Sequence, residues 1–244
     1  MRRVWKRYSL NFWNAGMNRI LTISSLNKRF GSLLAVRDFS LTLDKGEVLG
    51  IFGANGAGKT TLIRMIIGLT KPTSGEYIVA TGSRIGYMSQ SFSLVGTLTV
   101  LENFEFYGAL YNLPWQEFIT QRDRFINHFK MDEYLNVRAN RLPAGRKQLL
   151  AFSISRLHSP TLLLLDEPTS GLDLLNRKRL WEAVRNAANE GIAILVSTHY
   201  LDEAFHCDNM VMMEHGAIKA YGKPVDLAAK AGGDLINLFL EEMK

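Results

Sequence analysis

A short apolar run that leads directly into a glycine-rich segment limits the possible folds of this chain more than any other stretch. Val48 to Phe52 predict a strand that is buried on both faces. The next eight residues, Gly53 to Thr60, match the pattern G-x-x-x-x-G-K-[ST]. A helical run follows, with apolar residues at positions 62, 63, 65, 66 and 67. Strand, loop and helix together predict a P-loop, which binds nucleotide phosphates.

The residue types in this loop explain how it would hold phosphate. Gly53, Gly56 and Gly58 let the backbone curl until successive N–H groups point inward, and the positive end of the following helix adds to the attraction. Lys59 supplies a mobile cation for the β and γ phosphates, and the hydroxyl of Thr60 is a ligand for Mg²⁺. A plain glycine-rich turn is the ordinary alternative, which the match at eight positions disfavours.

Composition fits one large α/β domain, or such a domain with an inserted lobe. The chain has 244 residues, of which 47% are hydrophobic and 21% are charged. The single cysteine, Cys207, permits no internal disulfide, so we expect a reducing, cytosolic setting. No run of about 18 apolar residues is present to span a bilayer. Any membrane role is therefore expected to need partner chains.

The net charge of +6 is concentrated near the N-terminus. Eight of the 29 basic residues precede the first acidic residue, Asp38. Removing those eight leaves 21 basic residues against 23 acidic ones. This balance argues against a nucleic-acid-binding surface spread over the domain. We expect no nucleic acid among the partners.

Residues 1–19 read as a basic and aromatic extension. If it were helical, aromatic and basic side chains would lie on different faces, as in a helix on an anionic membrane surface. The extension lacks the long apolar segment of a secretory signal. A partly disordered tail, or a protein that starts at Met17, accounts for the same residues.

The rest of the chain divides into three expected parts. Residues 20–90 hold a small antiparallel β subdomain, in which Ile20 to Leu26 and Phe39 to Leu43 alternate apolar with polar residues, and also the P-loop. Residues 91–159 show helical periodicity, in Val100 to Tyr111 and in Trp115 to Phe129, and predict an inserted helical subdomain. Residues 160–244 return to the parallel core and are expected to end in a hairpin and a helix.

Two adjacent carboxylates follow a second buried run. Thr161 to Leu165 predict a buried strand, and Asp166 and Glu167 lie at its carboxyl end, where ligands bind in open α/β sheets. Asp166 is expected to hold the Mg²⁺ shell, and Glu167 to orient or deprotonate the water that attacks the γ phosphate. Such pairs also occur as mere solubilising residues, but this pair lies downstream of a P-loop, which favours catalysis.

In combination these motifs resemble the ATP-binding cassette (ABC) ATPases over about residues 20–225. The segments that carry the resemblance are Phe30, Gly53 to Thr60, Gln90, Asp166 to Ser170, Gly171 to Asp173, and His199. The resemblance implies an α/β fold, namely a P-loop NTPase with a RecA-like parallel-sheet core, a small antiparallel β subdomain and an inserted helical subdomain. It also implies ATP and Mg²⁺ as cofactors.

The same resemblance suggests a role for individual positions. Phe30 resembles the aromatic that stacks on adenine, Gln90 the loop glutamine at the Mg²⁺ shell, and His199 the switch histidine at the γ phosphate, although each could be purely structural. The expected catalytic residues are Glu167, His199, Lys59 and Gln90, and the expected metal ligands are Thr60, Gln90 and Asp166. The expected nucleotide-binding residues are Phe30, Gly53, Asn55, Gly56, Ala57, Gly58, Lys59, Thr60, Thr61, Gln90, Asp166 and Gly145.

Two loops bear on a partner subunit, because members of this family work as face-to-face dimers. Ser170 to Asp173 resembles the loop that crosses to the second subunit, although it would also serve as a turn and helix N-cap. The family's signature Leu-Ser-Gly-Gly-Gln is matched only by Leu142-Pro-Ala-Gly-Arg146. Pro143 offers neither a hydroxyl nor an N–H to the partner's phosphate. Arg146 could return some positive charge.

The resemblance implies the ATPase subunit of an ABC transporter. The run Thr99 to Asn103 is similar to exporter-type members whose membrane domains are separate chains. Partners would be transmembrane permease subunits and a second ATPase subunit, identical or paralogous, at the cytoplasmic face of the cell membrane. One alternative is a soluble ABC ATPase acting on ribosomes or DNA, although we expect such proteins to be longer. Another is a nucleotide sensor without turnover, which Glu167 and His199 disfavour.

Overall fold

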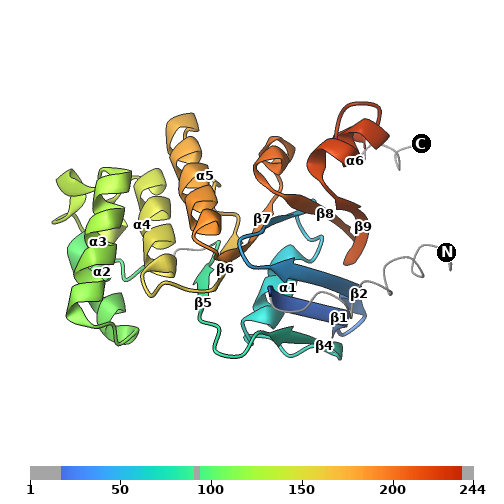
Figure 1. Ribbon diagram of the computed structural model, residues 1–244, viewed down its shortest axis with the longest axis horizontal. Coiled ribbons are helices and arrows are strands. Elements are labelled where there is room, and N and C mark those ends of the chain that lie inside the picture. Colours follow the sequence, from blue (N-terminus) through green and yellow to red (C-terminus); the bar gives the residue numbers. More distant parts are fainter. Residues whose placement is uncertain (1–17, 91–93, 238–244) are drawn as a thin grey trace.

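The computed structural model describes residues 18–90 and 94–237, arranged around two sheets (Figure 1). All but the last two residues of the N-terminal extension lie outside the described residues. Within the described ranges, no helix is long and apolar enough to cross a membrane. The boundaries expected at residues 19, 90 and 159 stay a prediction.

The larger sheet has six strands in the order β5-β6-β7-β3-β8-β9. Its strands are β3 (Val48–Phe52), β5 (Ile85–Met88), β6 (Leu162–Asp166), β7 (Ala193–Thr198), β8 (Asn209–Glu214) and β9 (Ala217–Gly222). All neighbours pair in parallel except β8 and β9, which form an antiparallel hairpin. Every residue of β3, β6 and β7 is buried, which accounts for their nearly continuous apolar sequences. This sheet is the predicted parallel core.

The smaller sheet is antiparallel, in the order β2-β1-β4. Its strands are β1 (Arg19–Phe30), β2 (Leu33–Asp44) and β4 (Ser74–Val79). The strands predicted to end at Leu26 and to begin at Phe39 both continue to the turn between β1 and β2. Alternation fails there because the register shifts between Ile23 and Lys28, and such bulges preserve pairing while breaking the side-chain pattern.

Three helices form the predicted helical subdomain at one end of the molecule (Figure 1). They are α2 (Val100–Leu110), α3 (Trp115–Phe129) and α4 (Ala144–Arg156), with two short 3-10 turns between α3 and α4, at Asp132–Tyr134 and Ala139–Arg141. The start of α2 has a sequence-encoded cap, since Thr99 accepts from the backbone of Glu102 and Glu102 accepts from the backbone of Thr99. The two helical runs predicted from periodicity, Val100 to Tyr111 and Trp115 to Phe129, match α2 and α3 to within one residue.

The remaining helices cover the two faces of the large sheet. They are α1 (Lys59–Ile66), α5 (Leu174–Asn189), α6 (Pro224–Lys230) and the 3-10 segment Leu201–His206. Residues of α1 belong to one hydrophobic core together with residues of β1 and β2. Residues of α4 and α5 belong to a second core with the opposite face of β6 and β7. The sheet is thus covered on both sides, as a parallel sheet requires.

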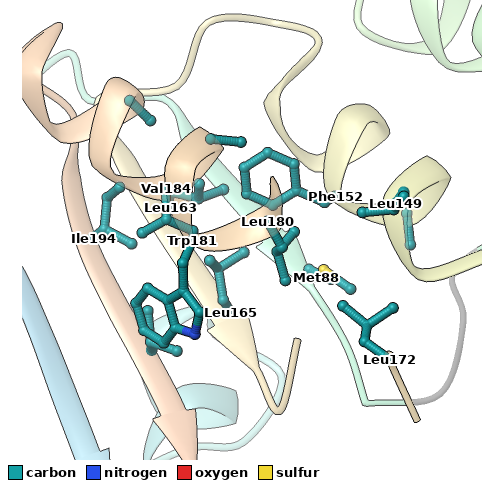
Figure 2. Packing of buried hydrophobic residues seen from close by; sticks show 14 of the residues in the cluster. Met88, Leu149, Phe152, Leu163, Leu165, Leu172, Leu180, Trp181, Val184 and Ile194 are labelled. Carbon is teal, nitrogen blue, oxygen red and sulfur yellow. The ribbon is translucent and has the colours of Figure 1, made fainter. Parts of the chain in front are cut away.

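The second core continues from the large sheet into the helical subdomain without a break. Figure 2 shows Phe152 of α4 and Trp181 of α5 packed over Leu163 and Leu165 of β6. The ring of Phe152 also meets Phe129 of α3 edge to face, at a centroid distance of 5.9 Å. The helical subdomain and the parallel core therefore share one set of buried contacts.

Ion pairs tie the same two parts together at the surface. Glu190, which follows α5, pairs with Arg124 of α3 and with Arg156 of α4. The side chain of Arg156 is 5% exposed, so this pair is better shielded from solvent than an ordinary surface pair. Because Glu190 pairs with one arginine on each of α3 and α4, these ion pairs favour a fixed orientation of both helices relative to α5.

The shared core predicts a large stability loss on truncation of Phe152. Phe152→Ala should lower the free energy of unfolding by about 3–5 kcal/mol, because a buried ring is lost and a cavity remains. Leu110→Ala, in the same subdomain at a side chain that is 63% exposed, is the control and should change it by about 0.5 kcal/mol or less. Denaturant unfolding measures both, and similar losses in the two variants would contradict a shared core.

Candidate nucleotide site

The P-loop lies at the carboxyl end of β3 and is packed against two other segments. A Cβ atom on Gly53 would lie 2.3 Å from the carbonyl oxygen of Met213. One on Gly58 would lie 2.2 Å from the carbonyl oxygen of Ala35, and Gly58 has a φ of 106°. Glycine is therefore required at both positions, at Gly53 for space and at Gly58 for space and for backbone conformation.

Lys59 begins α1 and curls back over this loop. Its ammonium donates to the carbonyl oxygens of Gly53 at 2.7 Å and Ala54 at 3.1 Å, and lies 3.8 Å from a carboxylate oxygen of Glu167. Burial lowers the pKa of Lys59, although the charges of Glu167 and Asp166 oppose the shift. The cation is thus held at the loop that would bind phosphate.

Asp166 has the donor geometry that a hard divalent cation needs. It is 1% exposed, and its Oδ1 accepts from Ser197 Oγ at 2.5 Å and from Thr60 Oγ1 at 3.2 Å. Its Oδ2 is buried and has no hydrogen-bond partner among the described residues. An unpaired carboxylate oxygen beside a hydroxyl supplies the hard oxygen ligands that Mg²⁺ prefers. These residues therefore fit the expected metal.

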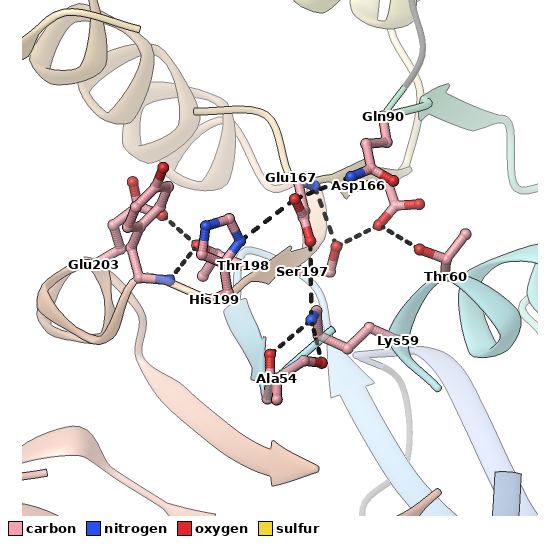
Figure 3. A network of polar contacts seen from close by, with 12 residues as sticks. Ala54, Lys59, Thr60, Gln90, Asp166, Glu167, Ser197, Thr198, His199 and Glu203 are labelled. Atoms are coloured by element: carbon pink, nitrogen blue, oxygen red, sulfur yellow. Dashed lines mark hydrogen bonds and ion pairs between the residues drawn. The ribbon is translucent and has the colours of Figure 1, made fainter. Parts of the chain in front are cut away.

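Glu167 is the point at which the predicted catalytic residues meet (Figure 3). Its carboxylate lies 3.2 Å from Gln90 Nε2, 3.4 Å from His199 Nδ1 and 3.8 Å from Lys59 Nζ. The residue is 7% exposed, and its backbone has a φ of 52°. Left-handed backbone at a residue other than glycine is strained and is typical of functional sites. The structure thus brings these four side chains together, from four separate segments.

The loop that carries His199 is held by its own neighbours. The hydroxyl of Thr198 donates to Glu203 at 2.7 Å and accepts from the backbone N–H of Tyr200 at 3.0 Å. The ring of Tyr200 lies 4.1 Å from that of His199 and 4.7 Å from the guanidinium carbon of Arg177. These contacts fix the direction in which His199 points.

An open cleft of about 920 Å³ runs along the P-loop. The predicted residues that line it are Phe30, Asn55, Gly56, Ala57, Gly58, Lys59, Thr60, Thr61, Gln90, Glu167 and His199. Phe30 is 50% exposed, so it is not a core residue, and the ammonium of Lys28 lies 4.8 Å from its ring centroid. Arg37 and His215 also line the cleft, and nothing in the sequence pattern singled them out.

Gly145 is a predicted nucleotide-binding residue whose neighbours belong to a different part of the chain from the P-loop. It does not line the cleft and instead belongs to the first turn of α4. A Cβ atom there would lie 3.4 Å from Leu172 and 3.5 Å from Asn176. Asp173, between these two residues, caps α5 by accepting from the backbone of Asn176 at 2.9 Å. Ser170 to Asp173 therefore form the turn and helix N-cap expected from the sequence as the alternative to a loop that crosses to a second subunit.

The expectation that Arg146 adds positive charge at the signature loop was wrong. Its guanidinium donates to the carbonyl oxygen of Phe129 at 2.7 Å and of Lys130 at 3.2 Å, and stacks over Tyr134 at 4.8 Å. These carbonyls are at the C-terminal end of α3, where a cation is favoured. Pro143 is the N-cap of α4.

Comparison with known proteins agrees with this geometry. The protein family described as "ABC transporter" matches residues 36–170 of the chain. The chain belongs to this family. That range includes the P-loop, Gln90, the signature position and Glu167. The resemblance found from sequence motifs is therefore confirmed, and so is the predicted fold class.

Related proteins carry names of ABC transporter components. The chain is 36% identical over 225 residues to "Probable multidrug ABC transporter ATP-binding protein YbhF" of Escherichia coli, covering 88% of this chain and 39% of that one. It is 34% identical over 215 residues to "Nod factor export ATP-binding protein I" of Rhizobium johnstonii, covering 84% and 69%. A solved structure, "Structure of ATP binding subunit of ABC transporter", superposes with a TM-score of 0.83 at 28% identity, covering 92% and 100%. The chain thus spans about two fifths of the Escherichia coli relative.

The position of Lys59 predicts that its removal weakens nucleotide binding itself. Lys59→Ala should cost about 1.5–3 kcal/mol for lost charged hydrogen bonds, or roughly a tenfold to hundredfold rise in the Kd for ATP. Lys45→Ala is the control, because Lys45 is exposed at the opposite end of β3. Calorimetric titration with ATP checks both, and an unchanged Kd in Lys59→Ala would show that the loop does not bind the phosphates.

Proposed function

We propose that this chain binds ATP with Mg²⁺ in the cleft along the P-loop and hydrolyses it to drive transport by partner membrane subunits. The observation that carries the proposal is the meeting of Gln90, His199 and Lys59 around the carboxylate of Glu167. A buried carboxylate that accepts a hydrogen bond from Gln90 and has an imidazole and an ammonium within 4 Å is poised to orient a water molecule.

Each residue then has a defined task. The backbone of the P-loop and Lys59 hold the phosphates, Phe30 offers its exposed ring to the base, and Glu167 accepts a proton from the attacking water. Thr60, Gln90 and Asp166 would hold Mg²⁺, which when bound would supply positive charge to the phosphate oxygens. The ring of His199, with Nδ1 3.4 Å from the carboxylate of Glu167, limits the directions in which that carboxylate can turn.

Transport requires partners that this chain would engage from the cytoplasmic face of a cell membrane. A second ATPase subunit, identical or paralogous, would place its signature loop over the nucleotide, and permease subunits would carry the substrate. The names of the relatives, which include multidrug transport and Nod factor export, support export. They favour this proposal over a soluble ABC ATPase that acts on ribosomes or DNA.

Replacement of Glu167 tests the proposed chemistry directly. Glu167→Gln should lower the ATPase rate by roughly 10² to 10⁴-fold, because it removes the proton acceptor and keeps the shape, while the Kd for ATP stays unchanged. The matched control is Asp202→Asn, since Asp202 is an exposed carboxylate three positions beyond His199. Rates measured on the assembled complex decide the matter, and full turnover in Glu167→Gln would exclude this residue as the base.

Because Pro143 has neither a hydroxyl nor an N–H, we expect slow ATP hydrolysis at the partner subunit's nucleotide, which the loop from Leu142 to Arg146 would face. In the assembled complex Pro143→Ser should raise the ATPase rate, since it adds a hydroxyl and an N–H, and about 10² to 10³-fold is the upper bound for one restored donor. Serine is also a preferred N-cap, the position that Pro143 holds. Pro143→Ala, which adds the N–H alone, separates the two donors. Rates that stay flat or fall in both variants would identify Leu142 to Arg146 as a working variant signature.

A further inference from the structure

A buried glutamine on α4 makes a contact that the proposed mechanism does not use. Gln148 is 2% exposed, and its Nε2 donates to the backbone carbonyl oxygen of Glu167 at 3.2 Å. Its Oε1 is also buried, and in the part of the chain that the structure describes it has no hydrogen-bond partner. An amide with one buried, unpaired oxygen adds little to the stability of the fold, because leaving that oxygen without a hydrogen bond costs free energy. A contribution to stability therefore does not explain why Gln148 contacts Glu167.

Glu167 is one of seven non-glycine residues with a positive φ in the described part of the chain. With a φ of 52° it lies in the left-handed region, where a side chain with a Cβ atom is disfavoured. Its N–H donates to Ser197, to the backbone oxygen at 3.0 Å and to Oγ at 3.1 Å. The carbonyl on the other side of the same Cα atom accepts from the backbone N–H of Ser170 and from Gln148 Nε2, each at 3.2 Å, and Gln148 is the side-chain donor of the two. These contacts together fix the peptide groups on both sides of the catalytic carboxylate.

We propose that Gln148 is a positioning residue for Glu167, and the inference rests on the proposed function. By fixing the carbonyl of Glu167 it keeps the strained backbone in place, and so keeps the carboxylate between Gln90 and His199. Gln148 lies less than one helical turn beyond Gly145 in α4. Because a helix moves as a rigid body over so short a distance, a displacement of the signature loop would reach Glu167 of the same chain through this side chain.

The test is Gln148→Met, which keeps the length of the side chain and removes the donor. We expect kcat for ATP hydrolysis to fall roughly tenfold to a hundredfold, as for a small misplacement of a reacting group. We expect the KM for ATP and the midpoint of thermal unfolding to stay unchanged, since one hydrogen bond and one unpaired acceptor are lost together. Ser153→Ala is the matched control, because Ser153 is 1% exposed on the same helix and bonds only Leu149 within it.

Two further measurements separate positioning from a structural role. In a Glu167→Gln background, Gln148→Met should add no further loss of rate, because both changes act through one group. A crystal structure of the Gln148→Met chain should show the Glu167 carboxylate moved away from His199 or its backbone out of the left-handed region. An unchanged kcat in Gln148→Met, or an undisturbed Glu167 in that structure, would overturn the inference.

The crystallographic result also separates this inference from the proposed function. A wild-type complex without ATPase activity would remove the proposed hydrolysis, whereas the position of Glu167 in the Gln148→Met structure would still decide whether Gln148 holds it. Loss of thermal stability in Gln148→Met that matches its loss of rate would assign Gln148 a purely structural role and would also overturn the inference.

Discussion

Parallel pairing of β7 with both β3 and β6 is the interaction on which the site depends. Phe52 of β3 lies opposite Thr198 of β7, and Asp166 of β6 lies opposite Ser197 of β7. Because the carboxyl ends of parallel strands meet at one edge of a sheet, the segments that follow these three strands start side by side. The P-loop, Glu167 and His199 are neighbours for this reason, although long stretches of chain separate them.

The apolar character of the same strands makes this edge rigid enough to hold strain. Alternate residues of β6 enter different cores, Leu163 and Leu165 on one face and Leu162 and Leu164 on the other. With both faces packed, the sheet cannot relax to relieve one unfavourable residue at its edge. The left-handed backbone of Glu167 is therefore supported by burial of residues that take no part in the chemistry.

The helical subdomain is joined to this edge through α4. The helix packs Phe152 into the shared core, donates from Gln148 to Glu167 and begins at Pro143 in the variant signature loop. Arg146 attaches the first turn of α4 to the end of α3. One helix thus links packing, the catalytic carboxylate and the loop expected to face a partner subunit.

The sequence alone was enough for the features that local patterns encode. The motif from Gly53 to Thr60, the apolar runs of β3 and β6, and the helical periodicity of α2 and α3 each depend on residues close together in the chain. For that reason the fold class and the family could be predicted from them, together with the P-loop residues that line the cleft, whereas Arg37 and His215 of the same cleft could not. The site assignments themselves remain predictions until nucleotide and metal binding are measured.

Tertiary structure decided whatever depends on register and on the reach of long side chains. No local pattern indicates that Ser197 hydrogen-bonds Asp166, since that contact follows from the pairing of β6 with β7. Nor does any pattern show that Arg146 turns toward α3 or that Gln148 reaches the carbonyl of Glu167. Motifs determined which chemical groups the chain carries, whereas strand register and helix packing decided which of them meet, because contacts between distant residues exist only once the sheet has formed.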